Sequence, residues 1–427
     1  MAQGESTRVQ EAQKAAKSDP RKAEELFKEI ISQPPSSATS DAAVKEYETA
    51  LISLGELYRD ENPPRKTQEL VDLITKSRTV LSSFAKAKTA KLVRSLLDLF
   101  ENIEGSTDIQ IAVTKSCIEW ATSERRSFLR QNLETRLVTL LMAKQSYYDA
   151  LTLINGLLRE LKRLDDKLVL VEVQLLESRV YHALGNIPKA RAALTSARTS
   201  AASVYTPPLL QAHLDMQSGM LHAEDKDFNT AFSYFIEALD GYHTQDESVK
   251  ATAALQYMLL CKIMLNLADD VNNLMTSKQA QKYASKNLEA MKAIARAHSN
   301  RSLEEYEQAL QSYREQLGSD AFIRNHLRRL YDAMLEQNLI KVIEPFSRVE
   351  INHIAKMVGL DTQQVERKLS QMILDKVIIG VLDQGAGCLI IYDETERDSA
   401  YDHALATIEK LSSVVDVLYT NQASMLE

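Results

Sequence analysis

The segment 321–392 constrains the fold of this chain more than any other stretch of its sequence. Apolar residues recur at helical spacing over 321–337 and predict an amphipathic helix there. Val342 and Ile343 come next and predict one short strand, which Pro345 ends because its nitrogen cannot donate a hydrogen bond to a neighbouring strand. The segment therefore opens with a helix that is followed closely by a strand.

Residues that start and stop helices mark two further helices. Ser347, with Glu350 three residues later, forms a capping box for the second helix, and Gly359 suits its C-terminal end. Asp361 is placed to cap the third helix, in which apolar residues again recur at helical spacing. We therefore expect two short helices that are joined by a tight turn.

A β-hairpin closes the segment. Residues 376–382 and 388–392 are apolar and rich in strand-forming side chains, and a glycine-containing turn at 383–387 separates them. Helix, strand, helix, helix and hairpin in this order are typical of a winged helix. We therefore expect a winged helix over 318–392, with the hairpin as its wing.

The expected winged helix lacks the charge of a nucleic-acid reader, which needs a basic face to neutralise phosphates. Its third helix has equal numbers of acidic and basic side chains, and its wing has no Lys or Arg. The whole chain has 51 Lys and Arg against 59 Asp and Glu, a net charge of -8. Both the local balance and the total argue against nucleic-acid binding.

The middle of the chain repeats a helical hairpin. Ala150, Ala190 and Ala231 each stand near the start of a predicted helix, about 40 residues apart. A small residue at this point lets the two helices of a hairpin approach closely, as in tetratricopeptide repeats. The spacing exceeds the usual ~34 residues, so we predict hairpins with longer helices.

Apolar stripes at helical spacing extend this pattern in both directions. Stacked hairpins bury one continuous core, so we predict a helical solenoid over 20–317. The fold class is therefore mainly α: a right-handed tetratricopeptide-like solenoid, a winged helix and a C-terminal helix. The additional helices of the solenoid are predicted at 46–58, 67–84, 89–103, 253–267, 278–297 and 303–317.

The two ends of the chain differ from the solenoid. Residues 1–19 contain almost no large apolar side chains, which predicts a frayed helix or a flexible tail, and the stretches 34–40 and 62–64 predict loops. The last segment, 393–427, predicts a long helix with one apolar seam between polar faces. This helix can pack back on the winged helix, but its position after a complete fold favours pairing with other helices. The seam consists of Ala404, Ile408, Leu411, Val415 and Leu418.

The sequence contains no pattern of residues for catalysis or metal binding. The eight His residues are scattered, and Cys117, Cys261 and Cys388 are isolated, which suits a reducing compartment. No phosphate-binding loop, zinc-ligand spacing or stretch of about 18 apolar residues occurs. We therefore expect no enzyme activity, no cofactor, no metal and no membrane span.

The combination of repeats and winged helix resembles the PCI family, named for the proteasome lid, the signalosome and initiation factor three. The motifs EPFSRVEINHIA and VERKLSQMILDK and the wing GVLDQGAGCLIIYDE are similar to one branch of that family, the non-ATPase regulatory subunit six family of the 26S proteasome lid. YETALISLGELYRDE and FLRQNLETRLVTLL extend the resemblance into the N-terminal half, so it covers nearly the whole chain.

This resemblance implies a non-catalytic scaffold of the 19S regulatory particle. The winged helix would contact other PCI subunits of the lid, and the C-terminal helix would join a common bundle. The N-terminal solenoid would reach an ATPase-ring subunit and an outer-ring subunit of the core particle, in the cytoplasm and nucleus. Two alternatives remain: a scaffold of a related PCI complex, the signalosome or initiation factor three, and a winged-helix protein that binds nucleic acid.

The wing predicts a second contact surface besides the C-terminal seam. Its last strand is apolar and has neither a charge nor a proline to protect an edge. We therefore hypothesise that this strand is an exposed sheet edge that pairs with a neighbouring winged helix. The residues of this expected edge are Leu389, Ile390, Ile391 and Tyr392.

Overall fold

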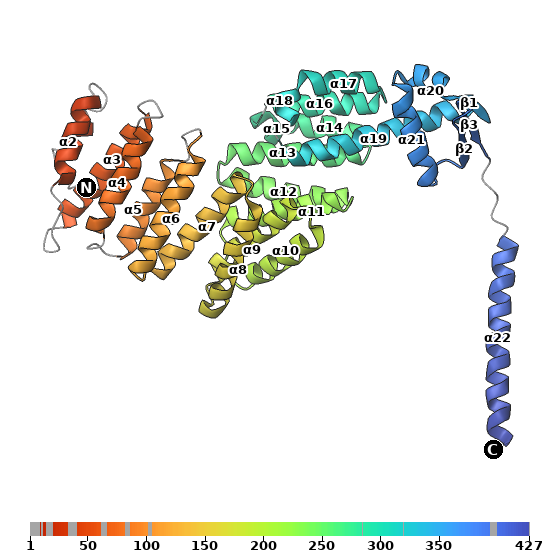
Figure 1. Cartoon of the computed structure of the whole chain (residues 1–427), viewed down its shortest axis with the longest axis horizontal. Helices are drawn as coiled ribbons and strands as arrows, with labels where there is room; N and C mark the ends of the chain where they lie inside the picture. Colours follow the sequence, from red (N-terminus) through yellow and green to blue (C-terminus); the bar gives the residue numbers. More distant parts are fainter. Residues whose placement is uncertain are drawn as a thin grey trace. The chain divides into compact units, whose positions relative to one another are not determined.

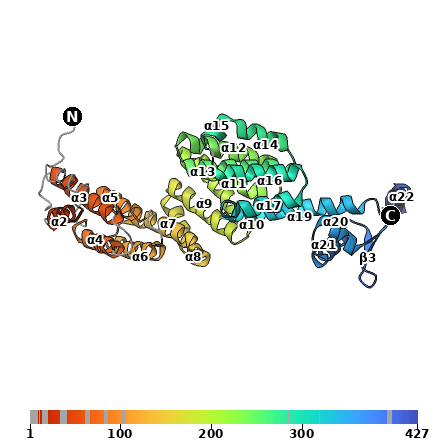
Figure 2. The ribbon, with the colours of Figure 1, turned by 90° about the horizontal axis from the view of Figure 1, so that it is seen from above.

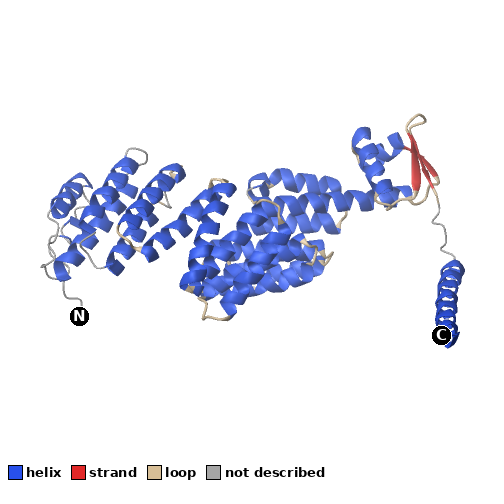
Figure 3. Ribbon diagram, turned by 60° about the horizontal axis from the view of Figure 1, so that its bottom comes forward, coloured by secondary structure: helices blue, strands red, loops and turns tan. Residues whose placement is uncertain are grey.

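The computed structural model describes residues 9, 12–13, 20–32, 41–60, 66–81, 86–100, 105–283, 285–318, 320–392 and 399–426. The chain divides into two compact units, Met1–Leu265 and Asn266–Glu427. Helices dominate the described part of both units, and its strands belong to one small sheet in the second unit (Figure 1, Figure 3). The predicted mainly α fold class is confirmed.

Successive antiparallel helices build the first unit as a solenoid. From α6 to α13 each helix packs against the next, and α9 also packs directly against α7 and α11. Figure 2 shows these helices side by side from a second direction. The helices are α2 (Pro20–Ser32), α3 (Asp41–Asp60), α4 (Lys66–Leu81), α5 (Lys86–Asp98), α6 (Thr107–Ser123), α7 (Ser127–Ala143), α8 (Tyr147–Leu164), α9 (Lys167–Ala183), α10 (Ile187–Ala202), α11 (Pro208–Glu224), α12 (Phe228–Thr244) and α13 (Ser248–Met264).

Several turns of the solenoid use the left-handed backbone conformation. Gly185, between α9 and α10, has a φ of +75°, and the Lys189 amide donates to the side-chain oxygen of Asn186, which caps α10. Arg125 and Gln145 adopt the same region, with φ of 53° and 65°, before α7 and α8. One turn geometry is therefore repeated, and it directs each helix back along its predecessor.

Small residues bring the two helices of a hairpin together. Ala150, Ala190 and Ala231 are each 0% exposed, which confirms their predicted place in the helix contacts. The Ser178 hydroxyl on α9 donates to the Ala190 carbonyl oxygen on α10 at 2.8 Å. A larger side chain at Ala190 would separate these two groups, so the hydrogen bond depends on the small residue.

The pair α11 and α12 shows the same close approach at two glycines. A Cβ atom on Gly219 would lie 2.6 Å from the Cε1 atom of Phe235, and one on Gly241 would lie 2.7 Å from the Cβ atom of Ala212. Carbon atoms that are not bonded do not approach so closely. Both positions therefore require glycine at the observed distance between the helices.

A buried glutamine recurs on alternate helices of the solenoid. Gln131, Gln174, Gln217 and Gln256 lie on α7, α9, α11 and α13, and each is at most 6% exposed. One side-chain amide atom of each has no hydrogen-bond partner among the described residues. Burying an amide atom without a partner in the protein costs free energy, so polar burial at these four positions offsets part of the gain from apolar packing.

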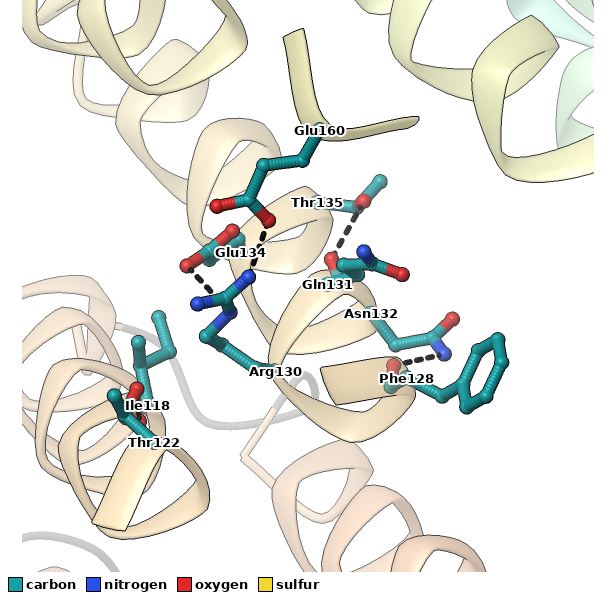
Figure 4. A network of polar contacts seen from close by, with 9 residues as sticks. All are labelled: Ile118, Thr122, Phe128, Arg130, Gln131, Asn132, Glu134, Thr135 and Glu160. Carbon is teal, nitrogen blue, oxygen red and sulfur yellow. Dashed lines mark hydrogen bonds and ion pairs between the residues drawn. The ribbon is translucent and has the colours of Figure 1, made fainter. Parts of the chain in front are cut away.

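A charged network joins α7 to α8 (Figure 4). Arg130 contacts Glu134, one turn further along α7, and Glu160 on α8. Burial raises the pKa of the Glu134 carboxyl above its ordinary value, while Arg130 opposes that rise and Glu160 adds to it. Because a rise remains, ionised Glu134 is less favourable in the folded protein than in the unfolded chain.

The second unit begins with shorter helices than were predicted. The expected helix at 278–297 is interrupted where Ser285 takes an extended conformation, with φ -146° and ψ 159°. The expected helix at 303–317 is interrupted at Tyr313, with φ -113° and ψ 31°. The elements are α14 (Ala268–Thr276), α15 (Lys278–Lys282), α16 (Lys286–Ser299), α17 (Leu303–Ser312) and α18 (Arg314–Gly318).

The winged helix follows, and its three strands form an antiparallel sheet in the order β1-β3-β2. Strand β3 aligns Leu389 with Val349 on one side and with Leu382 on the other. The elements are α19 (Ala321–Ile343), β1 (Arg348–Glu350), α20 (Ile351–Val358), α21 (Thr362–Leu374), β2 (Gly380–Asp383) and β3 (Cys388–Ile391).

Two local predictions in this domain are wrong, and one is confirmed. The predicted strand at Val342 and Ile343 is the last turn of α19, because Ile343 continues the buried face of that helix. The capping box that was predicted from Ser347 does not form, because Glu350 occupies the N-cap position of α20 without a side-chain bond. Gly359, with a φ of 76°, ends α20 as predicted.

The described residues near the N-terminus differ from the predicted flexible tail. Val9 and Ala12 are buried, and the side-chain amide of Gln13 donates to the hydroxyl of Ser53 on α3 at 3.3 Å. These positions are therefore packed, whereas the sequence predicted a frayed or flexible segment. The other residues of 1–19 and the predicted loops at 34–40 and 62–64 lie outside the described residues. The predicted C-terminal helix is α22 (Ser399–Leu426).

We predict that Gly219→Ala lowers the free energy of unfolding by about 1–2 kcal/mol. Phe235 is fully buried and cannot move away from the added methyl group, and this overpacking outweighs the gain in helix propensity. Urea unfolding, followed by circular dichroism, measures the change. The control is Gly156→Ala on α8, where a Cβ would meet no atom within 4 Å, so this variant is at least as stable as the parent. Equal behaviour of the two variants would contradict the close approach of α11 and α12.

We predict that Glu134→Gln raises the thermal midpoint at neutral pH. The folded protein holds the Glu134 proton more tightly than the unfolded chain, so its contribution to stability is present at low pH and is lost as pH rises through the folded pKa. The advantage of the variant therefore shrinks as the buffer is acidified towards the ordinary range of a glutamate. Thermal scans across pH test this, with the exposed Glu119→Gln as control. A lower midpoint for Glu134→Gln at neutral pH would show that the contact with Arg130 dominates.

Candidate protein-interaction surfaces

The predicted sheet edge at Leu389, Ile390, Ile391 and Tyr392 is wrong. Strand β3 lies in the middle of the sheet and pairs with β1 on one side and β2 on the other. Leu389 is 0% exposed, and its apolar character serves the core of the domain. The open edges of the described sheet therefore belong to β1 and β2, and a proline at Ile390 would disrupt the sheet itself.

Strand β2 combines an open edge with an exposed apolar surface. Leu374, Val377, Ile379 and Val381 lie along and just before this strand, and Tyr392 follows its partner β3. Each of these five side chains is between 45 and 80% exposed. We call this group the β2 patch. Exposed apolar groups beside an unpaired strand edge are typical of a binding site.

The sequence contained a signal for the β2 patch. Val377, Ile379 and Val381 alternate along the stretch that was predicted as a strand, so they share one face. A strand with one solvent-exposed face carries polar residues at such positions, yet all three are apolar. Apolar residues on both faces therefore indicate either complete burial or a partner, and their exposure here favours a partner.

The third helix of the winged helix has few free positive charges. The Lys368 ammonium on α21 lies 2.7 Å from the Glu336 carboxylate on α19. The Gln384 amide on the wing donates to Glu366 on α21 at 2.7 Å, so the wing meets an acidic group of this helix. This arrangement leaves little positive charge to neutralise the phosphates of a nucleic acid.

The described residues contain neither a metal cluster nor a candidate membrane helix. No group of three or more His, Cys, Asp or Glu side chains within them could hold a metal ion. Every helix in the described ranges is too short or too polar to span a bilayer. The three cysteines, Cys117, Cys261 and Cys388, are buried and form no disulfide.

The C-terminal helix α22 exposes its whole apolar seam. Ala404, Ile408, Leu411, Val415 and Leu418 are all exposed, so in this chain they remain available to a partner. At 100° per residue, the exposed Leu405 and Val414 widen the apolar arc to about half of the circumference. The exposed Val417 lies outside this arc, so the other faces are less polar than predicted. Such an arc is broad enough to contact more than one helix.

Three family models match this chain in sequence order. The N-terminal domain of the 26S proteasome regulatory subunit RPN6 matches residues 5–144. The PCI domain matches residues 310–393, which include the winged helix. The C-terminal helix domain of the 26S proteasome subunit RPN6 matches residues 397–423, and most of α22 falls in that range.

Whole-chain comparison agrees with these models. A probable 26S proteasome regulatory subunit rpn6 of Schizosaccharomyces pombe is 53% identical over 416 residues, which cover 97% of this chain and 98% of that protein. The chain belongs to the RPN6 family of 26S proteasome regulatory subunits.

Two further members of the RPN6 family show similar coverage. The 26S proteasome regulatory subunit RPN6 of Saccharomyces cerevisiae is 49% identical, with 92% of this chain and 91% of that protein covered. The 26S proteasome non-ATPase regulatory subunit 11 homolog of Arabidopsis thaliana is 48% identical, with 91% and 92% covered. The likeness therefore includes both units of the chain.

We predict that deletion of residues 399–427 leaves the thermal unfolding midpoint of the purified chain unchanged. The exposed apolar arc of α22 contributes little buried area to the isolated chain, so its removal costs little stability. Differential scanning calorimetry of the full-length and shortened chains measures the difference. A clear fall in the midpoint on truncation would show that α22 belongs to the folded core.

Proposed function

We propose that this chain is a non-catalytic scaffold subunit of the lid of the 26S proteasome regulatory particle. The observation that carries this proposal is 53% identity over 97% of the chain to a protein named as a proteasome regulatory subunit. A second relative is named as a non-ATPase regulatory subunit. The role is structural in ubiquitin-dependent protein degradation, in the cytoplasm and the nucleus, and chemistry is left to other subunits.

The second unit supplies the contacts within the lid. The β2 patch offers an open strand and apolar side chains to the winged helix of a neighbouring PCI subunit, which extends the sheet. The exposed arc of α22 joins a bundle with the corresponding helices of other subunits. Both surfaces are apolar and exposed in the single chain, and this supports burial in an assembly.

The first unit reaches partners outside the lid. We propose that its solenoid binds an ATPase-ring subunit and an outer-ring subunit of the core particle, and so clamps the two particles together. Solenoids bind through extended surfaces. Four large apolar side chains, Phe128, Tyr148, Tyr205 and Val249, are 68 to 83% exposed on this unit and support such contacts.

The alternative roles have less support. A scaffold of the signalosome or of initiation factor three is disfavoured because the similar proteins named above are proteasome subunits. A nucleic-acid role is disfavoured because Lys368 is paired with Glu336 and the wing has no Lys or Arg. The balanced charge of the third helix points in the same direction.

We predict that Val381→Lys reduces incorporation into the lid by roughly tenfold without unfolding the protein. The substitution places a charge on the open edge of β2, where Val381 is 50% exposed, and a charge on such an edge blocks pairing with another strand. Co-expression with the other lid subunits, followed by native electrophoresis and mass spectrometry, measures incorporation.

Met357→Lys is the matched control for this test, because Met357 on α20 is 59% exposed and lies outside the β2 patch. Thermal midpoints of both variants should equal that of the parent. Wild-type incorporation of Val381→Lys would exclude β2 as the contact edge. Failure of the parent chain to join any lid subunit would reject the proposed function as a whole.

A further inference from the structure

The second unit contains a cavity of about 530 Å³ between α17, α18 and α19, on the helices that precede the winged helix. This volume lies within the range of sites that hold a ligand or a large side chain. Leu310, Leu317, Leu327 and Tyr331 supply its apolar surface. The cavity is separate from the β2 patch and from α22, because it shares no residue with either.

The apolar surface of the cavity is held in place by buried contacts. Leu317 and Leu327 are each 3% exposed. The Tyr331 hydroxyl donates to a carboxylate oxygen of Glu307 at 2.9 Å, and its ring lies 5.8 Å from the ring of the fully buried Tyr306. The Tyr306 hydroxyl in turn donates to the Leu327 carbonyl oxygen at 2.8 Å. The cavity is therefore preformed, and binding there need not order its walls.

Three arginines line the same cavity. Arg314 comes from α18, and Arg324 and Arg328 come from α19. All three are exposed, and none of their side chains makes a hydrogen bond or an ion pair with another described residue. Arg324 and Arg328 are four residues apart on one helix, where like charges repel each other. An anionic ligand would relieve that repulsion and would pair with guanidinium groups that have no other described partner.

The residues that line the cavity carry a net positive charge, whereas the whole chain is net negative. The chain carries a net charge of -8, yet three guanidinium groups and one carboxylate, that of Glu307, line this cavity. The Glu307 carboxylate already accepts the hydrogen bond from Tyr331. Positive charge is therefore in excess around an apolar surface, and a ligand that matches both features has an apolar part flanked by acids.

We propose that this cavity binds an acidic peptide segment of a partner protein, with one large apolar side chain of the segment inside the cavity. The carboxylates that flank that side chain pair with Arg314, Arg324 and Arg328, for which the planar guanidinium group is suited. A small polyanion would satisfy the arginines alone and would leave the apolar surface of the cavity uncovered. The site does not depend on the proposed scaffold role, since it is built from side chains of this unit.

Fluorescence anisotropy with labelled synthetic peptides tests this proposal on the purified full-length chain. The probe is acetyl-Asp-Glu-Phe-Glu-Asp-amide, and we expect it to bind more weakly as salt is raised. Replacing its Phe by Ser should weaken binding by about tenfold, because the apolar contact is lost. The matched peptide with Lys in place of each acid should not bind.

Two kinds of variant separate the contribution of charge from that of the cavity. Arg328→Glu should weaken binding of the Phe peptide at least about tenfold, because it turns an attraction into a repulsion. Arg329→Glu changes the net charge equally, one position along α19 and outside the cavity lining, and should leave binding unchanged. Gly318→Leu keeps all three arginines and projects into the cavity, where a Cβ meets no atom within 4 Å, so it should abolish the preference for Phe over Ser.

Three outcomes would overturn the proposal. The first is equal binding of the Phe and Ser peptides, and the second is full displacement of the Phe peptide by an equal concentration of tripolyphosphate, since either result would indicate a general anion site. The third is an equal loss of binding in Arg328→Glu and Arg329→Glu, which would indicate attraction by net charge alone. Circular dichroism confirms the fold of each variant, and Gly318→Leu tests the cavity without changing any charge.

Discussion

The distance between paired helices is the constraint on which the first unit depends. Gly219 and Gly241 allow α11 and α12 to approach until no space for a Cβ remains, and Ala190 keeps α10 close enough for the hydrogen bond from Ser178. A solenoid has no central core that could absorb an error in one layer, because each hairpin contacts mainly its neighbours. A small change at one of these positions therefore shifts every helix that follows.

The sequence predicted the helices of both units well where their causes are local. Ala150, Ala190 and Ala231 mark the hairpins through residue size and spacing, and Gly359 marks a helix end through its backbone conformation. Such signals act over a few residues and need no knowledge of the tertiary structure. The helix at Val342 was misjudged because a β-branched residue prefers strands, whereas burial against the rest of the domain outweighed that preference.

The candidate contact surfaces were harder to predict because they depend on pairing between distant segments. An apolar strand such as Cys388–Ile391 can be an edge or a centre, and its own residues do not decide which. Its position was decided by β1, a three-residue strand that the sequence placed several residues too early. Because β3 lies between β1 and β2, the open edge beside the apolar residues belongs to β2 and not to β3. The arginine-lined cavity was also missed because it depends on packing between separate elements. Arg314 and Arg328 line one cavity only when α18 packs on α19.

The buried glutamines on α7, α9, α11 and α13 have a mechanical consequence. When two neighbouring layers separate slightly, water reaches an amide atom that had no partner, and its hydration returns part of the free energy that the lost apolar contact costs. Bending the stack at these layers is therefore easier than the buried area alone would suggest. We therefore expect the stack to open first at the layers that contain these glutamines.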